Sequence, residues 1–538
     1  MLSFTAVLVL VIVPLYTVLL LVASRRVGSA TGARDFLNGG GEFSAWQVFT
    51  LVSALWCSSI FVVEMETGYL FGVSALWFGF STALMALVSG YLVPTFRRLG
   101  YLTSSGVIGV RFGQLGRVLS GLVIGLTFPI FAMSNVLGAA GFLHRVAGWP
   151  LALTLVVAVA VILGYVCVGG MRALARAQSI NLLVMTVGLV GALVWAVRAV
   201  PISQLGATVP PRLLTVGGAG AGLILTWVFA ALLNVVNAQA EFQILTAARD
   251  ARSARRGLHA SVLFTAVFTI GSVAIGIAAR SLARPHELGV AAIPGLFDRA
   301  PSMLLALVAL AVWASALSWS SPLMLSGAAS LGVDVLQPLL RRARRPSARN
   351  VAFYVRIALP VQALLIVGFA VLRPADLAWW RIFGQTVRTG ALFAVTLAVL
   401  ALPRVGRREA VASIVGGAAG GLGWNVLTRF SADRFAWGVN PMWVGASVGL
   451  LILAAGVLRG QPARPAVLLG DAWPAVLLTV AGVDLLLLGW QPGPARQLGL
   501  TGPGILLAAG CLLMLRWYTD RAPQHVDLPA SVAERIGE

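Results

Sequence analysis

About fifteen apolar stretches follow one another along this chain of 538 residues, and most of them contain 18 residues or more. A helix of that length crosses the hydrocarbon core of a bilayer, which is roughly 30 Å thick. Because backbone N–H and C=O groups must be satisfied internally in lipid, such stretches fold as packed α-helices. The sequence therefore predicts an all-α, polytopic membrane bundle of about 15 spans. These are expected at 3–23, 44–72, 74–96, 118–142, 150–168, 177–199, 218–246, 260–282, 302–333, 352–372, 382–402, 409–427, 440–457, 473–490 and 498–516.

The basic residues indicate how this bundle is oriented. The chain carries 39 basic residues against 18 acidic ones, and every basic residue is an arginine. The arginines gather in alternate loops, and such an excess marks the cytoplasmic side. We therefore expect a multi-pass protein of the cytoplasmic (inner) membrane, with its N-terminus outside and its C-terminus in the cytoplasm. Membrane orientation explains the net charge of +21 without nucleic-acid binding.

Two predicted spans, 44–72 and 218–246, contain polar groups where a simple anchor is uniformly apolar. A charged side chain at bilayer depth is costly, so it usually faces a partner or a watery cavity. Two interrupted helices, each opening one half of a bundle, are typical of transporters that bind their cargo near the membrane midplane. The polar groups are Ser53, Ser58, Ser59, Glu64 and Glu66 in the first span, and Asn234, Asn237, Gln239, Glu241 and Gln243 in the second.

The acids of the first span pose a geometric problem. Glu64 and Glu66 point about 200° apart on a regular helix, so they can serve one small site only if the helix breaks. Gly68 makes a break or a wide turn plausible. The functional interpretation is a cation or proton site, and the alternative is an acid at the outer interface paired with an arginine.

In the second span, Asn234, Asn237 and Glu241 have the spacing i, i+3, i+7, which places them on one helical face. Such a stripe lines a cavity, or it supplies hydrogen bonds between helices.

A third polar stretch, SALSWSSP at 315–322, combines hydroxyl groups with a proline. Ser315 and Ser318 share a face, and Pro322 removes the backbone donor that would satisfy the carbonyl near Ser318. Hydroxyls and freed carbonyls at one depth are hard oxygen ligands for an alkali cation. The alternative is a packing face of small residues.

No clustered set of histidine, cysteine and carboxylate residues lies deep in a predicted span. This argues against a membrane enzyme, because metal-dependent and acyl-transfer chemistry both need such a set. We expect no catalytic residues and no cofactor other than a coupling ion.

Six segments, in order, are similar to motifs of the sodium:solute symporter family, which includes the proline and sodium–sugar symporters. The resemblance covers roughly residues 20–430. The segments are DFLNGGGEFSAWQV at 35–48, YLFGVSALWFG at 69–79, YVCVGGMRALARAQSIN at 165–181, QILTAARDARSARRG at 243–257, SALSWSSPLMLSGAASLGVDV at 315–335 and ALPRVGRREAVASIVGGAAG at 401–420.

The resemblance implies a LeuT-like core of two inverted five-helix repeats. The expected divisions are an N-terminal helix and loop at 1–43, the first repeat at 44–200, the second repeat at 201–402, peripheral helices at 403–519 and a cytoplasmic tail at 520–538.

The resemblance also implies a sodium site, with backbone carbonyls of Ser53, Trp56 and Ser315 and hydroxyls of Ser318 and the residue after it. That residue is Trp319, which has no hydroxyl. The aspartate that the family usually carries after its Gly-Gly stretch is Gln178 here. A register shifted by one residue would let Ser320 or Ser321 supply the missing hydroxyl.

The expected function is secondary active transport of a small organic solute by alternating access. Sodium is the coupling ion by resemblance, and a proton is possible because one sodium ligand is missing. The candidate solute contacts would favour a cationic or amine-bearing solute; they are Trp56, Glu64, Asn234, Asn237 and Glu241. A transporter-like sensor without net transport is the second hypothesis. The expected partners are the solute and the lipid bilayer, with no nucleic acid and a single chain as the working unit.

Overall fold

The computed structural model describes residues 4–25, 32–99, 103–282, 289–340, 348–372, 377–401, 405–431, 435–436 and 439–459. Within these ranges every named element is helical. Eight of the helices described are long and apolar enough to cross a membrane. The all-α membrane fold is thus confirmed, whereas the count of about fifteen spans is not. The predicted spans 473–490 and 498–516 and the tail 520–538 lie outside the described residues.

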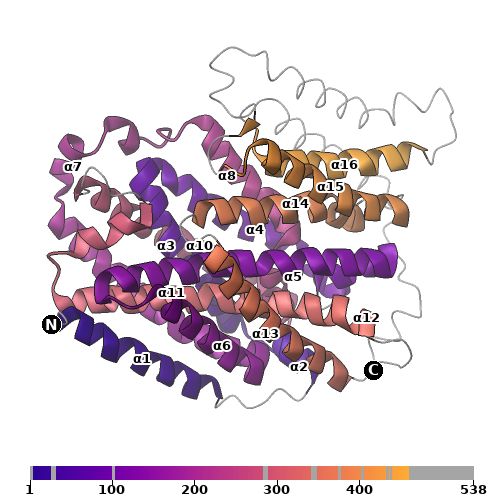
Figure 1. Ribbon diagram of the computed structural model, residues 1–538, viewed down its shortest axis with the longest axis horizontal. Coiled ribbons are helices and arrows are strands. Elements are labelled where there is room, and N and C mark those ends of the chain that lie inside the picture. Colours follow the sequence, from indigo (N-terminus) through magenta and orange to yellow (C-terminus); the bar gives the residue numbers. More distant parts are fainter. Residues whose placement is uncertain are drawn as a thin grey trace, which may run out of the picture. The chain divides into compact units, whose positions relative to one another are not determined.

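Helices and short helical turns follow one another in the order of the sequence (Figure 1). The first half contains α1 (Phe4–Arg25), α2 (Ala33–Asn38), η1 (Gly39–Gly41), α3 (Ala45–Phe71), η2 (Gly72–Ala75), α4 (Leu76–Leu99), α5 (Ser104–Ala147), α6 (Leu151–Ala199), α7 (Ile202–Thr208) and η3 (Pro211–Leu214). The second half contains α8 (Ala221–Asn234), η4 (Val235–Asn237), α9 (Gln239–Thr246), α10 (Ala251–Leu282), η5 (Gly289–Phe297), α11 (Ser302–Ala329), the π-helical turn η6 (Ser330–Leu336), α12 (Gln337–Leu340), α13 (Ala348–Leu372), α14 (Leu377–Ala401), α15 (Arg407–Leu427) and α16 (Pro441–Arg459).

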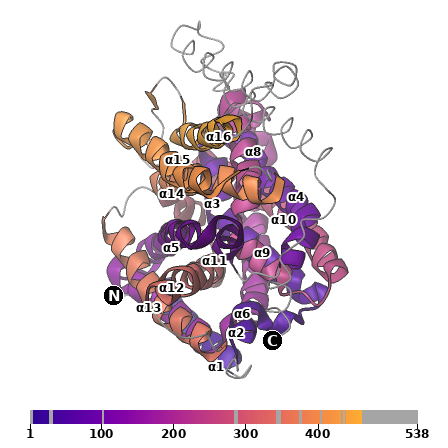
Figure 2. The ribbon, with the colours of Figure 1, turned by 90° about the vertical axis from the view of Figure 1, so that its right-hand side faces the viewer.

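The 49-residue helix α6 combines two of the predicted spans, 150–168 and 177–199. At about 1.5 Å per residue it is more than twice as long as a bilayer core is thick. Its two parts meet at Gly170, where the backbone has φ 52° and ψ −134°, a conformation open mainly to glycine. A side chain at Gly170 would also overlap the carbonyl oxygen of Phe36 on α2. The bend and the packing of α2 against α6 (Figure 2) therefore both require this glycine.

The chain forms two compact units. Unit 1 comprises Met1–Val93 and Ile124–Gly384. In it α3 packs along α10, while α6 and α11 pack on each other and on α3. Glycine allows the close approach of α3 and α10, because a Cβ at Gly276 would overlap the carbonyl oxygen of Met65, and a Cβ at Gly68 would lie 2.8 Å from that of Val273. Small residues at such contacts let membrane helices gain van der Waals packing.

Unit 2 comprises Pro94–Val123 and Gln385–Glu538. In its described part α15 packs along α16. Glycine contacts recur here, since a Cβ at Gly417 would overlap the carbonyl oxygen of Gly390, and one at Gly445 would lie 2.9 Å from that of Gly417. The guanidinium of Arg111 donates to the carbonyl of Ala398. Unit 2 is therefore held by close backbone contacts and by arginine bonding to a helix carbonyl.

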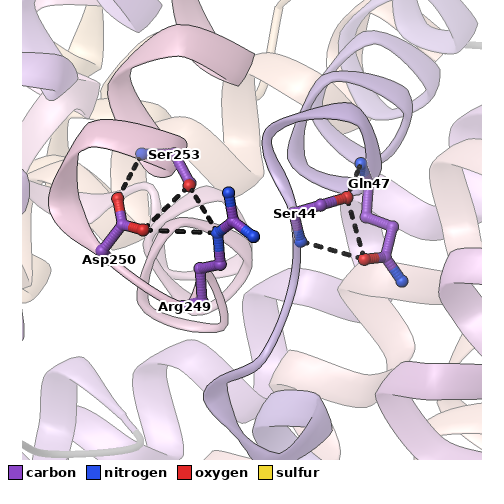
Figure 3. Close-up of polar contacts among 5 residues, drawn as sticks. All are labelled: Ser44, Gln47, Arg249, Asp250 and Ser253. Atoms are coloured by element: carbon purple, nitrogen blue, oxygen red, sulfur yellow. Dashed lines mark hydrogen bonds and ion pairs between the residues drawn. The ribbon is translucent and has the colours of Figure 1, made fainter.

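Main-chain bonds join the segment before α3 to the segment after α9. The amide of Phe43 donates to the carbonyl of Ala247 (3.0 Å), and the amide of Arg249 donates to the carbonyl of Phe43 (2.9 Å). Next to this pairing Ser44 caps α3 in a reciprocal arrangement with Gln47, shown in Figure 3. The starts of α3 and α10 are thus fixed to one another by backbone bonds.

Asp250 caps α10 from its position just outside the helix. Its carboxylate accepts from the amide (2.6 Å) and the hydroxyl (3.1 Å) of Ser253, and Arg249 lies 3.3 Å away (Figure 3). Hydrogen bonding from the Ser253 backbone, followed by the Ser253 hydroxyl and the charge of Arg249, lowers the pKa of Asp250. A lowered pKa means that the carboxylate stabilises the fold above its unfolded-state pKa and that this contribution is lost as pH falls through the folded-state pKa.

We therefore expect the first turn of α10 to open more often at acidic pH. Hydrogen–deuterium exchange of the Ser253 segment measures this opening. After correction for the intrinsic pH dependence of amide exchange, Asp250→Ala should show low protection at every pH. Asp250→Asn, which can still cap but does not titrate, should show protection that does not vary with pH. An identical pH profile in the wild type and Asp250→Asn would contradict this assignment.

Candidate functional site

The first interrupted span proves to be one α-helix, so the expected break in 44–72 is wrong. Helix α3 runs continuously from Ala45 to Phe71 and ends at Gly72. Its hydroxyl groups bond within the helix or stay buried; the Ser58 hydroxyl, for example, donates to the carbonyl of Leu55 (2.8 Å). Gly68 does not break the helix, because it serves as a contact point for α10. Polar residues alone do not break a helix when neighbouring helices bury them.

The second interrupted span does break, at the place where its polar residues gather. Helix α8 ends at Asn234, the turn η4 ends at Asn237, and Ala238 has φ −78° and ψ 57°, outside the helical region. Helix α9 then begins at Gln239. The predicted single face through Asn234, Asn237 and Glu241 is therefore wrong, because the helical spacing does not continue across Ala238.

Trp56 of α3 and Glu241 of α9 form the best-defined pair among the predicted solute contacts. The indole Nε1 of Trp56 donates to Oε2 of Glu241 at 2.8 Å. Glu241 is 1% exposed, and Ser89 of α4 lies beside its carboxylate. The Trp56 ring also faces the ring of Trp319 on α11, with centroids 5.9 Å apart. Trp56 thus contacts the buried carboxylate of Glu241 on α9 and the indole ring of Trp319 on α11.

The remaining predicted contacts occupy separate places. Glu64 is fully buried, but it faces α4 and α10: a Cβ at Gly79 would lie 2.6 Å from Glu64 Oε1 and would overlap the side chain of Thr269. Asn237 is buried, and its amide donates to the carbonyl of Leu233. Asn234 is half-buried, with its amide 3.4 Å from the sulfur of Met85. Glu64 therefore does not contact the Trp56–Glu241 pair, because Glu64 and Trp56 lie about two turns apart on α3.

Ser318 of α11 lies where α3, α6 and α11 meet. Its hydroxyl faces the carbonyl oxygen of Ala54 (3.1 Å) and donates to Oε1 of Gln178. The Nε2 of Gln178 donates in return to the carbonyl of Ser318 at 2.7 Å. Ala54, Gln178 and Ser318 are all fully buried. Where the family resemblance implied a sodium ligand at Ser318, the structure places the side-chain amide of Gln178.

The other proposed sodium ligands do not converge on this point. The Ser53 hydroxyl is buried without a hydrogen-bond partner, and the Ser315 hydroxyl donates to Val312 within α11. Trp319 donates to the carbonyl of Phe131 (2.8 Å), and Ser320 donates to the carbonyl of Ala132 (2.7 Å). The predicted carbonyl ligands, those of Ser53, Trp56 and Ser315, all lie within continuous helix, where amides four residues later engage them. These residues do not fit a bound sodium ion.

A second buried polar cluster joins α9 to α11. Its two glutamines were noted as polar groups of the span 218–246, but their contacts with α11 were not predicted. Gln239 donates to the carbonyl of Ser326 (3.0 Å) and bonds the hydroxyl of Ser330. Gln243 accepts from the Ser326 hydroxyl (2.6 Å) and donates to the carbonyl of Leu37 (2.7 Å). The i, i+4 spacing of the two glutamines was the available signal, since such residues share one helical face.

Comparisons with known proteins agree with this architecture. The human sodium/iodide cotransporter is 25% identical over 190 residues, which is 35% of this chain and 28% of that protein. Sodium-coupled monocarboxylate transporter 1 from Xenopus laevis is 25% identical over 173 residues, covering 32% of this chain and 28% of that protein. The matched part thus spans little more than a quarter of these relatives.

Solved structures show the same fold over nearly the whole chain. A substrate-bound, outward-open sodium-coupled sialic acid symporter has a TM-score of 0.69 at 17% identity, covering 86% of this chain and 99% of that one. A nucleobase-cation-symport-1 family transporter with a bound hydantoin has a TM-score of 0.51 at 13% identity, covering 94% and 98%. Both support a LeuT-like bundle. The profile of the sodium:solute symporter family matches residues 36–417, and this multi-pass membrane protein belongs to that family.

Proposed function

We propose that this protein is a secondary active transporter that carries a small organic solute through unit 1 by alternating access, coupled to a cation gradient. The observation that carries the proposal is the buried carboxylate of Glu241, bonded to the half-buried Trp56 beside the break at Ala238. An ionisable group inside a membrane bundle usually marks a transport pathway. A break in a helix at membrane depth is tolerated where the freed backbone lines a cavity or contacts other helices.

The chemistry of Trp56, Glu241 and Trp319 favours a solute that carries an amine or another positive group. Trp56 and Trp319 offer ring faces that attract cations, and Glu241 offers a carboxylate. Iodide and monocarboxylates, for which the matched relatives are named, are anions and would be repelled by an ionised Glu241. Our proposal therefore assigns this chain a different solute class from those relatives.

The further parts of the proposal follow from the sequence and the family. The two repeats at 44–200 and 201–402 would rock against one another around Trp56 and Glu241. Sodium and a proton are the alternative coupling ions, and Glu64, Glu241 and Asp334 are buried acids in the described part of unit 1 that could exchange a proton. The protein would act as a single chain in the cytoplasmic membrane, with its N-terminus outside, and would catalyse no covalent reaction.

Uptake into proteoliposomes tests the proposal. Purified protein is reconstituted, and radiolabelled amines, amino acids, sugars and monocarboxylates are offered under an imposed sodium gradient, under a proton gradient and under neither. We expect concentrative uptake of an amine-bearing solute with one of the two gradients. Saturable binding of that solute without uptake would instead support a sensor, and concentrative uptake of only monocarboxylates would contradict the proposed solute class.

A further inference from the structure

Gln178 and Ser318 bond each other through two complementary contacts at the junction of α3, α6 and α11, where the Ser318 hydroxyl also lies 3.1 Å from the carbonyl oxygen of Ala54. We infer that the side-chain amide of Gln178 takes the place of a monovalent cation at this junction, so the protein binds no sodium there. The inference concerns ion binding at one place in unit 1. One consequence rests on the proposed function: if the protein is a cation-coupled transporter, its coupling ion binds elsewhere in the molecule.

The first step of the argument is the carbonyl group of Ser318. Pro322 lies within α11 four residues later and has no backbone N–H, so the Ser318 carbonyl lacks its usual helical donor. A freed carbonyl in a dry interior needs a donor or a cation, because leaving it unsatisfied costs about 1–3 kcal/mol. The Nε2 group of Gln178 meets this need at 2.7 Å.

The second step is the orientation of the Gln178 amide. Only the NH₂ end can face a carbonyl oxygen, so the donor contact to Ser318 fixes which end is nitrogen. The oxygen end must then face the Ser318 hydroxyl, which donates to it. Both contacts are complementary, and the cluster is neutral. A sodium ion at this point would have to displace the NH₂ group without any carboxylate to balance its charge.

The third step is the shortage of other oxygen ligands. Hard cations such as sodium are held by several converging oxygens. Here the hydroxyl of Ser320 is engaged by Ala132, Trp319 has no oxygen in its side chain, and α3 remains helical through Ser53 and Trp56. The Ser321 hydroxyl, the other predicted substitute, is buried beside the hydroxyl of Tyr165. The Ser318 hydroxyl and the carbonyls of Ala54 and Ser318 are all within bonding distance of groups already present.

The same geometry indicates which substitution would convert this junction into a cation site. Gln178→Glu keeps the length and shape of the side chain, but it replaces the NH₂ group with a second carboxylate oxygen. That oxygen would face the Ser318 carbonyl, and either a bound cation or a proton on the carboxyl group would remove the repulsion. Sodium binding is therefore measured at alkaline pH, where protonation competes least. We expect Gln178→Glu to bind sodium at least tenfold more tightly than the wild type, and the double variant Gln178→Glu with Ser318→Ala to lose that gain.

The experiment measures binding of radioactive sodium to purified protein by scintillation proximity, with thermal unfolding in sodium or choline chloride as the second measurement. No solute and no transport are needed, so loss of the proposed transport function would leave this result unaffected. The wild type and Ser318→Ala should show the same response to sodium, even if Gln178→Glu cannot be purified.

Two outcomes would overturn the inference. One is saturable sodium binding by the wild type that Ser318→Ala abolishes, because the junction would then be a sodium site despite the amide. The other is a folded Gln178→Glu variant whose sodium binding equals that of the wild type. The inference is supported if Ser318→Ala leaves sodium binding at the wild-type level and Gln178→Glu binds sodium more tightly.

Discussion

Glu241→Gln is expected to reduce solute uptake at least tenfold while leaving the protein folded. Gln can still accept the hydrogen bond from Trp56, so the contact between α3 and α9 is preserved and only the negative charge is lost. A tenfold loss corresponds to about 1.4 kcal/mol of lost interaction with a cationic solute or coupling ion. The measurement is initial uptake in proteoliposomes, alongside thermal unfolding of the same preparation.

Two matched variants separate charge from packing in this experiment. Trp56→Phe keeps a ring beside Trp319 but removes the donor to Glu241, so it tests the hydrogen bond. Glu66→Gln is the control acid, because Glu66 lies on α3 and is only half-buried. We expect Glu66→Gln to retain most of the uptake. Equal losses in Glu66→Gln and Glu241→Gln would show that α3 and α9 do not form a specific site at Trp56.

Gly276→Val is expected to prevent unit 1 from folding normally. A Cβ at this position would overlap the carbonyl oxygen of Met65 and lie 2.8 Å from the amide nitrogen of Tyr69, and both of these are backbone atoms that cannot rotate away. Overpacking a tight contact costs about 1–3 kcal/mol, and more when the backbone must move. The variant should lose monodisperse protein in detergent and unfold at a lower temperature.

Gly141→Val is the matched control for this substitution. Gly141 lies in α5 within unit 1, and nothing lies within 4 Å of a Cβ built there. Both variants add the same β-branched side chain to a helix, so they share any loss of helix propensity. If Gly141→Val and Gly276→Val reduced stability equally, the close contact of α3 and α10 would not be the cause.

The sequence predicted the helices better than it predicted their breaks. Apolar length identifies a membrane helix directly, and α13, α15 and α16 agree closely with the spans expected at 352–372, 409–427 and 440–457. Whether a helix bends depends on tertiary contacts that composition does not show. Both Gly170 and Gly68 lie against a neighbouring helix, α2 and α10 respectively. Helix α6 bends at Gly170, whereas α3 stays straight at Gly68.

The site was predicted in part, and for a similar reason. A buried acid and an aromatic residue in two interrupted spans pointed to α3 and α9, and Trp56 and Glu241 do bond each other. The helical phase assigned to Asn234 and Asn237 failed at Ala238. The departure at Gln178 was visible as a missing charge, but its bond to the carbonyl freed by Pro322 emerges only when α6 and α11 are placed together.

The backbone pairing at Phe43 gives the two helices of the Trp56–Glu241 pair a common anchor. Because peptide groups at Phe43, Ala247 and Arg249 make these bonds, substitutions other than proline leave their donors and acceptors in place. Mutation can therefore reshape what the interior recognises while α3 and the end of α9 keep the same attachment to each other. Solute selectivity and the backbone attachment of α3 to the end of α9 can therefore evolve separately.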